Sequence, residues 1–224
     1  MTTLTTAPLA PLLGRLFDAA EASWSKDSPA AQYWASLSEE EQDRLMGSKS
    51  DYRDFYANLK DAPLAVSRST GTLLYILARG IRATKVVEFG TSFGLSTLHL
   101  AAAVRDNGGG HVITSEFEPS KAARAAENFE AAGLSDLIEI REGDALQTLS
   151  AGLPETIDLL LLDGAKGLYA DILRLVDGHL RPGSLIVADD AEHCPEYLDH
   201  VRTSGNGYLS VPLGPEVELS LRIG

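Results

Sequence analysis

Two short apolar runs, Asp158–Leu162 and Leu185–Ala188, constrain the fold of this chain more than any other feature. Successive side chains of a β-strand point to opposite faces of its sheet, so a run without alternating polar residues is buried on both faces. Such burial is typical of central strands in a parallel sheet that helices cover on both sides. The chain is therefore expected to adopt a layered α/β fold.

From Thr70 onward, further segments of strand and helix alternate along the chain. The expected strands are Lys85–Phe89, His111–Ser115, Ile138–Glu142, Ile157–Leu162, Ser184–Ala188, Tyr208–Pro212 and Leu219–Ile223. The expected helices are Gly71–Arg79, Ser96–Val104, Ser120–Ala132, Tyr169–Leu175 and Cys194–Arg202. This order predicts a Rossmann-like, doubly wound fold with a seven-stranded, mostly parallel sheet whose last strand is antiparallel.

The first part of the chain has a different, helical pattern. Apolar residues recur at helical spacing over Pro8–Trp24, a capping box at Ser38 begins a helix through Met46, and Tyr52–Leu59 is a further candidate helix. We therefore divide the chain into an N-terminal helical extension, residues 1–65, and a main domain, residues 66–224. The extension is rich in aromatic residues, which we interpret as packing residues rather than as the wall of a ligand pocket: Trp24, Tyr33, Trp34, Tyr52 and Tyr56.

Composition excludes several classes of protein. A formal net charge of −13, without a basic cluster, makes nucleic acid an unfavourable partner. No apolar run approaches the roughly 20 residues of a membrane span, and the first residues lack the pattern of a secretory signal, so we expect a cytoplasmic protein without a membrane partner. The single cysteine, Cys194, excludes an internal disulfide.

A glycine-containing segment, Glu88-x-Gly90-x-x-x-Gly94, ends the first expected strand and precedes a helix. Glycines at these places allow a tight turn and a close approach of the backbone to a ligand. The spacing differs from the G-x-G-x-x-G pattern by which dinucleotide-binding folds hold a pyrophosphate. By itself the segment is equally compatible with an ordinary strand-to-helix turn.

Acidic residues also follow the second and third expected strands. Glu116 stands where a carboxylate can accept both hydroxyls of a ribose, and Asp144 with the backbone of Ala145 stands where an adenine edge would lie. Each residue alone could be an ordinary surface group. Together with the glycine segment, in this order, they favour a site for an adenosyl ligand.

A second acidic group follows the fourth and fifth strands. Asp163, Asp189 and Asp190 would converge at neighbouring strand ends, where they either splay into solvent or hold a hard divalent cation such as Mg²⁺. Lys166 lies close to Asp163 in the sequence, and a neighbouring cation together with partial burial would favour its neutral, basic form. These four residues indicate a metal-assisted reaction with a lysine base.

The residues above make the stretch from about Ala65 to Ile223 resemble the catechol and caffeoyl-CoA O-methyltransferases, which are metal-dependent class I enzymes that use S-adenosylmethionine. The resemblance implies Lys166 as catalytic base, Asp163, Asp189 and Asp190 as metal ligands, and Glu218 as a substrate contact. The cofactor residues that it implies are Val66, Glu88, Gly90, Ser96, Glu116, Asp144, Ala145 and Asp163.

The implied reaction is transfer of a methyl group to one hydroxyl of a small catechol-like phenol, with Mg²⁺ chelating both oxygens. The resemblance also makes a homodimer possible. The alternatives left open are a metal-independent small-molecule methyltransferase and a catalytically silent adenosyl-binding module that acts on a protein partner. A nicotinamide-dependent dehydrogenase fits less well because its glycine pattern is missing, and a nucleic-acid or amine methyltransferase fits least.

Overall fold

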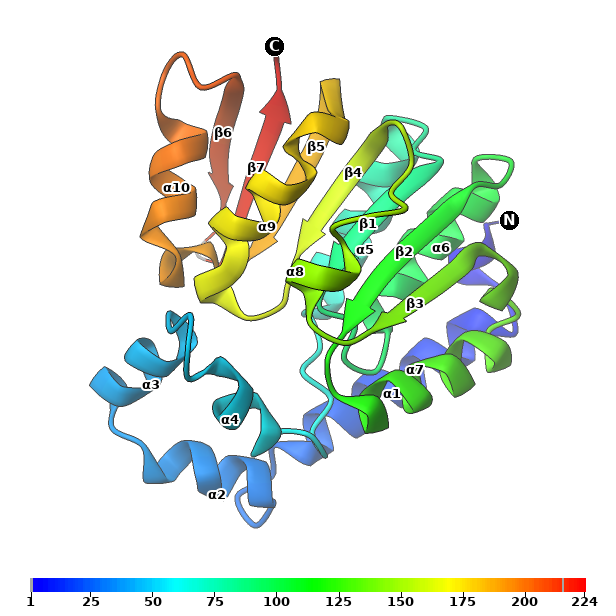
Figure 1. Ribbon diagram of the computed structural model, residues 1–224. Helices are drawn as coiled ribbons and strands as arrows, with labels where there is room; N and C mark the ends of the chain where they lie inside the picture. The colour runs from blue at the N-terminus through cyan, green and yellow to red at the C-terminus, as the bar shows by residue number, and fades with distance from the viewer. Residues whose placement is uncertain (1, 215) are drawn as a thin grey trace.

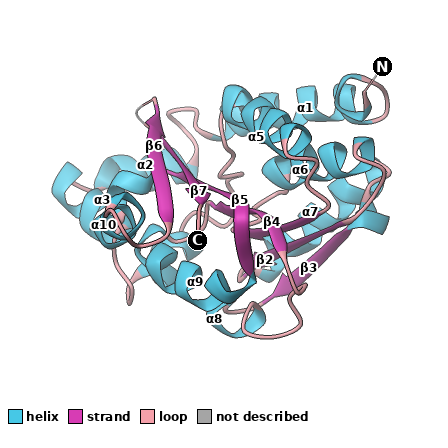
Figure 2. Ribbon diagram, turned by 90° about the horizontal axis from the view of Figure 1, so that it is seen from above, coloured by secondary structure: helices cyan, strands magenta, loops and turns pink. Residues whose placement is uncertain are grey.

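The computed structural model describes residues 2–214 and 216–224. One sheet forms the centre of the molecule, and helices cover both of its faces (Figures 1 and 2). Its seven strands run in the order β3-β2-β1-β4-β5-β7-β6. They are β1 (Lys85–Phe89), β2 (His111–Glu116), β3 (Ile138–Glu142), β4 (Ile157–Leu162), β5 (Leu180–Asp189), β6 (Tyr208–Leu213) and β7 (Val217–Arg222).

The strand directions confirm the predicted fold class. β1 pairs in parallel with β2 and β4, and β5 continues the parallel set beside β4. Only the last strand, β7, reverses direction, and it pairs antiparallel with both β5 and β6. The carboxyl ends of β1, β2, β4 and β5 therefore meet at one edge of the sheet, where ligands bind in folds of this type.

Ten α-helices are present in the described residues. Those of the main domain are α5 (Arg68–Gly80), α6 (Leu95–Asp106), α7 (Pro119–Ala131), α8 (Ala145–Thr148), α9 (Tyr169–Val176) and α10 (Pro195–Arg202). None of the helices in the described ranges is long and apolar enough to cross a membrane.

The central strands are buried on both faces because their side chains enter two separate cores. Leu159, Leu161 and Val187 contribute to the core beneath α5, α6 and α7. Leu160 and Leu162 point the other way, into the core beneath α8, α9 and α10. The apolar runs seen in the sequence are thus explained by two-sided burial.

The predicted N-terminal extension contains two structurally different parts. Its first helix, α1 (Leu9–Ser23), packs into the core beside α6. The next three helices, α2 (Pro29–Ser36), α3 (Glu39–Met46) and α4 (Tyr52–Ala57), lie beyond the carboxyl ends of the strands (Figure 1). We call these three helices the cap.

Helix α2 and the four-residue helix α8 were absent from the sequence prediction, although the start of α2 carries a recognisable signal. Ser28 accepts a hydrogen bond from the backbone of Ala31, and Pro29 occupies the first helical position. The remaining differences among the α-helices and strands are shifts at element ends. The largest is β5, which begins four residues before the predicted Ser184 because Leu180 pairs with Ile157 across a bulge.

Candidate active site

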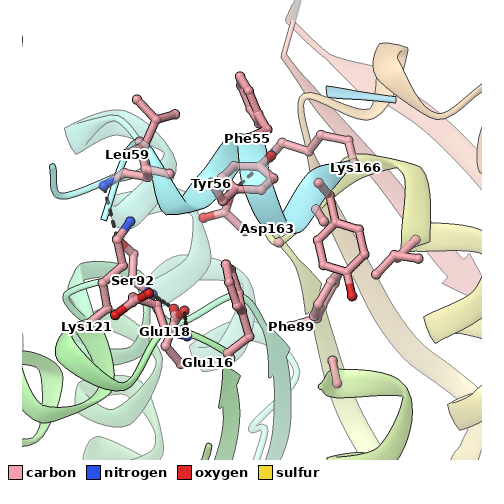
Figure 3. A pocket seen from close by; sticks show the side chains of 18 of the residues that line it. Phe55, Tyr56, Leu59, Phe89, Ser92, Glu116, Glu118, Lys121, Asp163 and Lys166 are labelled. Atoms are coloured by element: carbon pink, nitrogen blue, oxygen red, sulfur yellow. Dashed lines mark hydrogen bonds and ion pairs between the residues drawn. The ribbon is translucent and has the colours of Figure 1, made fainter. Parts of the chain in front are cut away.

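A cavity of about 450 Å³ opens at the carboxyl edge of the sheet, between the strand ends and the cap (Figure 3). Its floor comes from the loops that follow the five strands β1 to β5, and its roof from the cap. Seven of the residues predicted to bind a cofactor or a metal line it: Gly90, Glu116, Asp144, Ala145, Asp163, Asp189 and Asp190. Lys166 lines it as well.

The glycine segment forms the turn between β1 and α6 as the sequence suggested. Gly90 has a φ of +103°, and a Cβ at this position would collide with the backbone of Asp163 on the neighbouring strand end. Gly94 has a φ of +85°, and a Cβ there would strike the ring of Phe129. Both positions therefore require glycine, and the first brings the β1 and β4 loops together at the cavity floor.

Glu88 lies beneath this turn and is fully buried. Its two carboxylate oxygens accept hydrogen bonds from the hydroxyls of Ser96 and Thr97 in the first turn of α6. Burial raises the pKa of Glu88 to about 7, with the hydroxyl donors acting in the opposite direction. The side chain therefore connects the end of β1 to the start of α6 and does not enter the cavity.

The cavity end beneath β2 and β3 holds the predicted ribose and adenine contacts. The Glu116 carboxylate accepts backbone N–H groups of Ser92, at 2.7 Å, and of Glu118, at 3.0 Å. Asp144 accepts the backbone N–H of Leu146 at the start of α8 and forms a 2.7 Å ion pair with Arg53 of the cap. Both carboxylates are thus held in fixed orientations at the cavity wall.

The opposite end of the cavity contains the predicted base. The Lys166 ammonium lies 3.2 Å from Asp163 and 3.4 Å from Asp190, and its side chain is buried. Burial disfavours the charged form of Lys166 and so lowers its pKa. The neighbouring Tyr169, Asp163 and Asp190 raise the pKa by more, so the pKa of Lys166 lies above its usual value. In this arrangement Lys166 is a charged ammonium between two carboxylates.

Asp189 differs from the other two acids because it has a buried oxygen without a partner. Its Oδ1 is buried and accepts no hydrogen bond from the described residues. Burial, with the charge of Asp163 adding to it, raises the pKa of Asp189 to about 8. The backbone is fixed nearby, since the Tyr169 hydroxyl donates to the carbonyl oxygen of Asp189 at 2.7 Å. A buried oxygen without a donor is an available ligand for a cation.

No preformed metal cluster of three or more acidic, histidine or cysteine side chains occurs within residues 2–214 and 216–224. The three predicted ligands nevertheless line one cavity, and all carry the hard oxygen donors that Mg²⁺ prefers. Together with the unpartnered Asp189 oxygen, this donor set fits a divalent cation. In the arrangement described, the Lys166 ammonium neutralises part of the negative charge of these carboxylates.

Comparison with known proteins gives a consistent result. Residues 87–191 match the family model described as a methyltransferase domain. The catechol O-methyltransferase of Niastella koreensis is 34% identical over 143 residues, which cover 62% of this chain and 64% of that protein. The catechol O-methyltransferase of Mycobacterium tuberculosis is 35% identical over 127 residues, 57% of each chain. The chain thus spans less than two thirds of the length of these curated relatives.

The domain match coincides with the β1–β5 region that forms the cavity floor. Residues 87–191 thus carry a methyltransferase domain, and the chain is similar to catechol O-methyltransferases over about 60% of its length. Solved structures of O-methyltransferases have a similar fold. The O-methyltransferase TomG from Streptomyces achromogenes, in complex with SAM, superposes with a TM-score of 0.65 at 25% identity, covering 86% of this chain and 95% of that one.

Four residues that the family resemblance assigned to ligand binding do not line the cavity: Val66, Glu88, Ser96 and Glu218. Val66 is buried beside it, and the Glu88 carboxylate is engaged with the Ser96 hydroxyl. Glu218 lies on β7, where it pairs with Arg202 at 2.6 Å and accepts the Ser210 hydroxyl. Because Arg202 engages both of its carboxylate oxygens, the geometry gives no support to Glu218 as a substrate contact.

The interpretation of the N-terminal aromatics as packing residues was incomplete. Trp24, Trp34, Tyr52 and Tyr56 line the cavity, while Tyr33 packs against Phe55 and does not. The cap has only a small core of its own, around Phe55, and its residues Trp34, Tyr52 and Tyr56 also line the cavity. Helical spacing identified an apolar face but could not show which surface that face would cover.

Lys121 is a cavity residue that sequence reasoning missed. It lies on α7 near Glu116 and Glu118 and is almost entirely buried (Figure 3). Burial lowers the pKa of Lys121 to about 8 against the opposing charges of Glu116 and Glu118. Its only sequence signal was its position at the start of the helix that follows the expected ribose acid, a place where most lysines are solvent-exposed.

Proposed function

We propose that this chain transfers a methyl group from S-adenosylmethionine to a hydroxyl of a small, catechol-like phenol. The observation that carries the proposal is the single cavity that contains both an adenosyl-type wall, at Glu116 and Asp144, and an acid–lysine group, at Asp163 and Lys166. The names of the relatives in Niastella koreensis and Mycobacterium tuberculosis and the SAM complex of TomG support the same chemistry.

The loop after β1 would receive the cofactor. Gly90 lines the cavity and has no side chain that would hold a ligand away from its backbone, and Glu116 would accept the ribose hydroxyls with its remaining lone pairs. Asp144 and Ala145 would border the adenine. In this arrangement the sulfonium end of the cofactor would lie toward Asp163 and Lys166.

Asp163, Asp189 and Asp190 would hold a divalent cation, which when bound would chelate both oxygens of a vicinal diol and favour the phenolate. The fit rests on the hard donor set and on the buried, unpartnered Oδ1 of Asp189. Tyr169 holds the backbone carbonyl of Asp189, so the position of this ligand is fixed by the protein.

Lys166 would remove the phenolic proton as the oxygen attacks the methyl carbon. For this role its amine must first lose a proton, and pairing with Asp163 and Asp190 holds it in the charged form. Protonation of these carboxylates, or their binding to a cation, would lower the pKa of Lys166 and so favour its neutral, basic form. Alignment of oxygen, methyl carbon and sulfur would supply much of the rate.

The cap would exclude water and limit the size of the acceptor. Trp34 and Met46 of the cap, together with Leu59 just after α4, supply apolar wall on the side opposite the strand ends. A volume of about 450 Å³, which the cofactor must share, leaves space for a compact aromatic ring. This enclosure favours a small free phenol over an acyl-CoA conjugate.

The proposal is tested by a methyl-transfer screen of phenols with labelled S-adenosylmethionine, run with EDTA and again after Mg²⁺ is restored. We expect transfer to vicinal diols, loss of transfer with EDTA and recovery with Mg²⁺. No transfer to any phenol under either condition would contradict the proposed function and favour a silent adenosyl-binding module.

A metal-independent methyltransferase is the second candidate, and one observation favours it. The Lys166 ammonium already lies between two of the three acids, so their repulsion is partly balanced without a cation. Transfer that is unaffected by EDTA would support this candidate.

Cytoplasmic location and a homodimeric state stay predictions, for which cell fractionation and light scattering are the direct measurements.

A further inference from the structure

Tyr56 brings a hydroxyl group from the cap to the reacting end of the cavity. It lies on α4, lines the cavity, and is drawn beside Lys166 and Asp163 in Figure 3. Its ring packs edge-to-face on Phe55 with a centroid distance of 4.9 Å. Phe55 is itself buried in the core of the cap, so the Tyr56 ring is held in place by packing.

The Tyr56 hydroxyl differs from the other tyrosine hydroxyls near the site. Tyr169 donates to the backbone of Asp189, and the Tyr52 hydroxyl accepts from Arg53 at 3.1 Å. Among the hydrogen bonds of the described residues, none involves the Tyr56 hydroxyl. A polar group that faces an enclosed cavity without a protein partner is available to a ligand in that cavity.

This hydroxyl is a donor at neutral pH. Burial raises the pKa of Tyr56 to about 12, and the charge of Lys166 opposes that shift only in part. The carboxylates of Asp163 and Asp190 add to it. A fixed neutral donor near the position where phenolate charge develops stabilises that charge without reorganising.

We propose that the Tyr56 hydroxyl donates a hydrogen bond to an oxygen of the phenolic acceptor, so that the cap supplies a catalytic group as well as a wall. This inference rests on the proposed function. In the step, Lys166 takes the phenolic proton, the oxygen–methyl bond forms and the methyl–sulfur bond breaks, giving the neutral thioether product. Tyr56 keeps its own proton throughout.

The test compares Tyr56→Phe with Tyr33→Phe, which alters a ring that packs on the same Phe55 but lies outside the cavity lining. Binding of 4-nitrocatechol, in the presence of Mg²⁺ and S-adenosylhomocysteine, is followed by its phenolate absorbance at one fixed pH. The kcat and KM for catechol are measured separately. Phenylalanine keeps the ring contact with Phe55, and thermal unfolding verifies that both variants are folded.

We expect Tyr56→Phe to reduce the phenolate fraction of the bound probe and to lower kcat by roughly 10- to 100-fold, the effect of one hydrogen bond to a charged group. Affinity for S-adenosylhomocysteine and all properties of Tyr33→Phe should stay at wild-type values. A folded Tyr56→Phe protein with wild-type probe spectrum and kcat overturns the inference while the proposed function stands.

The spectroscopic readout separates the two proposals. Suppose that the wild-type protein ionises the bound probe but methylates no phenol, and that Tyr56→Phe no longer ionises the probe. This result would support the contact of Tyr56 with the acceptor and overturn the proposed function. A wild-type protein that leaves the probe un-ionised overturns the role of Tyr56.

Discussion

Lys166 is the residue on which the proposed chemistry depends most. Its ammonium is buried between Asp163 and Asp190, and no other lysine of the described residues is paired in this way with two of the predicted metal ligands. A lysine held in this manner is charged at rest and becomes a base only when its partners are otherwise engaged. Its removal should therefore affect chemistry more than binding.

We expect Lys166→Ala to lower kcat by roughly 10²- to 10⁴-fold, the usual contribution of a general base. Affinity for S-adenosylhomocysteine should change little, because the ribose and adenine walls lie at the other end of the cavity. Turnover and calorimetric binding provide the measurements, with the exposed Lys60→Ala as control. Activity near the wild-type level in Lys166→Ala would exclude it as the base.

Glu88 gives a prediction about stability rather than turnover. Its pKa rises from an ordinary value near 4.5 to about 7 because it is buried. The folded protein therefore binds a proton at Glu88 that the unfolded chain has already lost above pH 4.5. The stability that this proton confers is fully present below pH 4.5 and is lost as the pH rises through about 7.

Glu88→Gln should flatten the pH dependence of the free energy of unfolding between pH 4.5 and 7, since glutamine does not titrate. Urea unfolding of both proteins across this range measures the effect, with the exposed Glu142→Gln as control. Parallel profiles for wild type and Glu88→Gln would show that Glu88 is ionised in the fold throughout.

At the scale of elements, the pair between α10 and β7 explains why Glu218 is buried. Glu218 is 2% exposed, and Arg202 forms two hydrogen bonds with its carboxylate. Ser210 on β6 donates a third. The three groups join one helix to both antiparallel strands, which is a structural role.

Arg202→Met should lower the free energy of unfolding by about 2 kcal/mol, because it leaves a buried carboxylate with Ser210 alone. Chemical denaturation measures this loss. Arg124→Met is the matched control, since its 3.3 Å pair with Glu127 is exposed and should contribute less than about 1 kcal/mol.

In addition, Glu218→Gln should leave the KM for the acceptor unchanged. A large rise in that KM, without loss of stability, would restore Glu218 as a substrate contact.

The cap connects to the main domain largely through polar and aromatic contacts at the cavity rim. Arg53 pairs with Asp144, and Tyr52 packs edge-to-face against Phe117 at 6.3 Å. The cap core around Phe55 is small and separate from the two cores of the sheet. These features suit an element that must admit ligands and then enclose them.

At the scale of the whole molecule, ligand binding and folding are coupled, because a ligand of the cavity contacts both the strand ends and the cap. S-adenosylhomocysteine at 100 times its Kd should stabilise the protein by about 2.7 kcal/mol. For a chain of this length, that free energy corresponds to a rise in Tm of roughly 5–10 °C. Thermal unfolding with S-adenosylhomocysteine and, separately, with NAD tests it, and a shift with NAD alone would favour the dehydrogenase alternative.

The fold was predictable because its strongest signals are local. The runs at Leu159–Leu162 and Leu185–Ala188 specify two-sided burial wherever they lie, and Gly90 and Gly94 require a turn that other residues cannot form. The preference for right-handed crossovers between parallel strands then decides on which face of the sheet each connecting helix lies. By the same topology, the sequence alone placed Glu116, Asp144, Asp163 and Asp189 at one edge of the sheet.

Other properties depended on contacts between segments far apart in the chain. Sequence could not show that Trp24, Trp34 and Tyr56 face the cavity, because an amphipathic helix does not specify the surface that it covers. Nor could it show that Glu218 is paired with Arg202, or that Lys166 is charged between two acids. The sequence by itself determined the sheet and the edge where the ligand residues gather. Only the tertiary structure decided which of those residues are free to bind, since both burial and electrostatic pairing depend on what packs opposite each side chain.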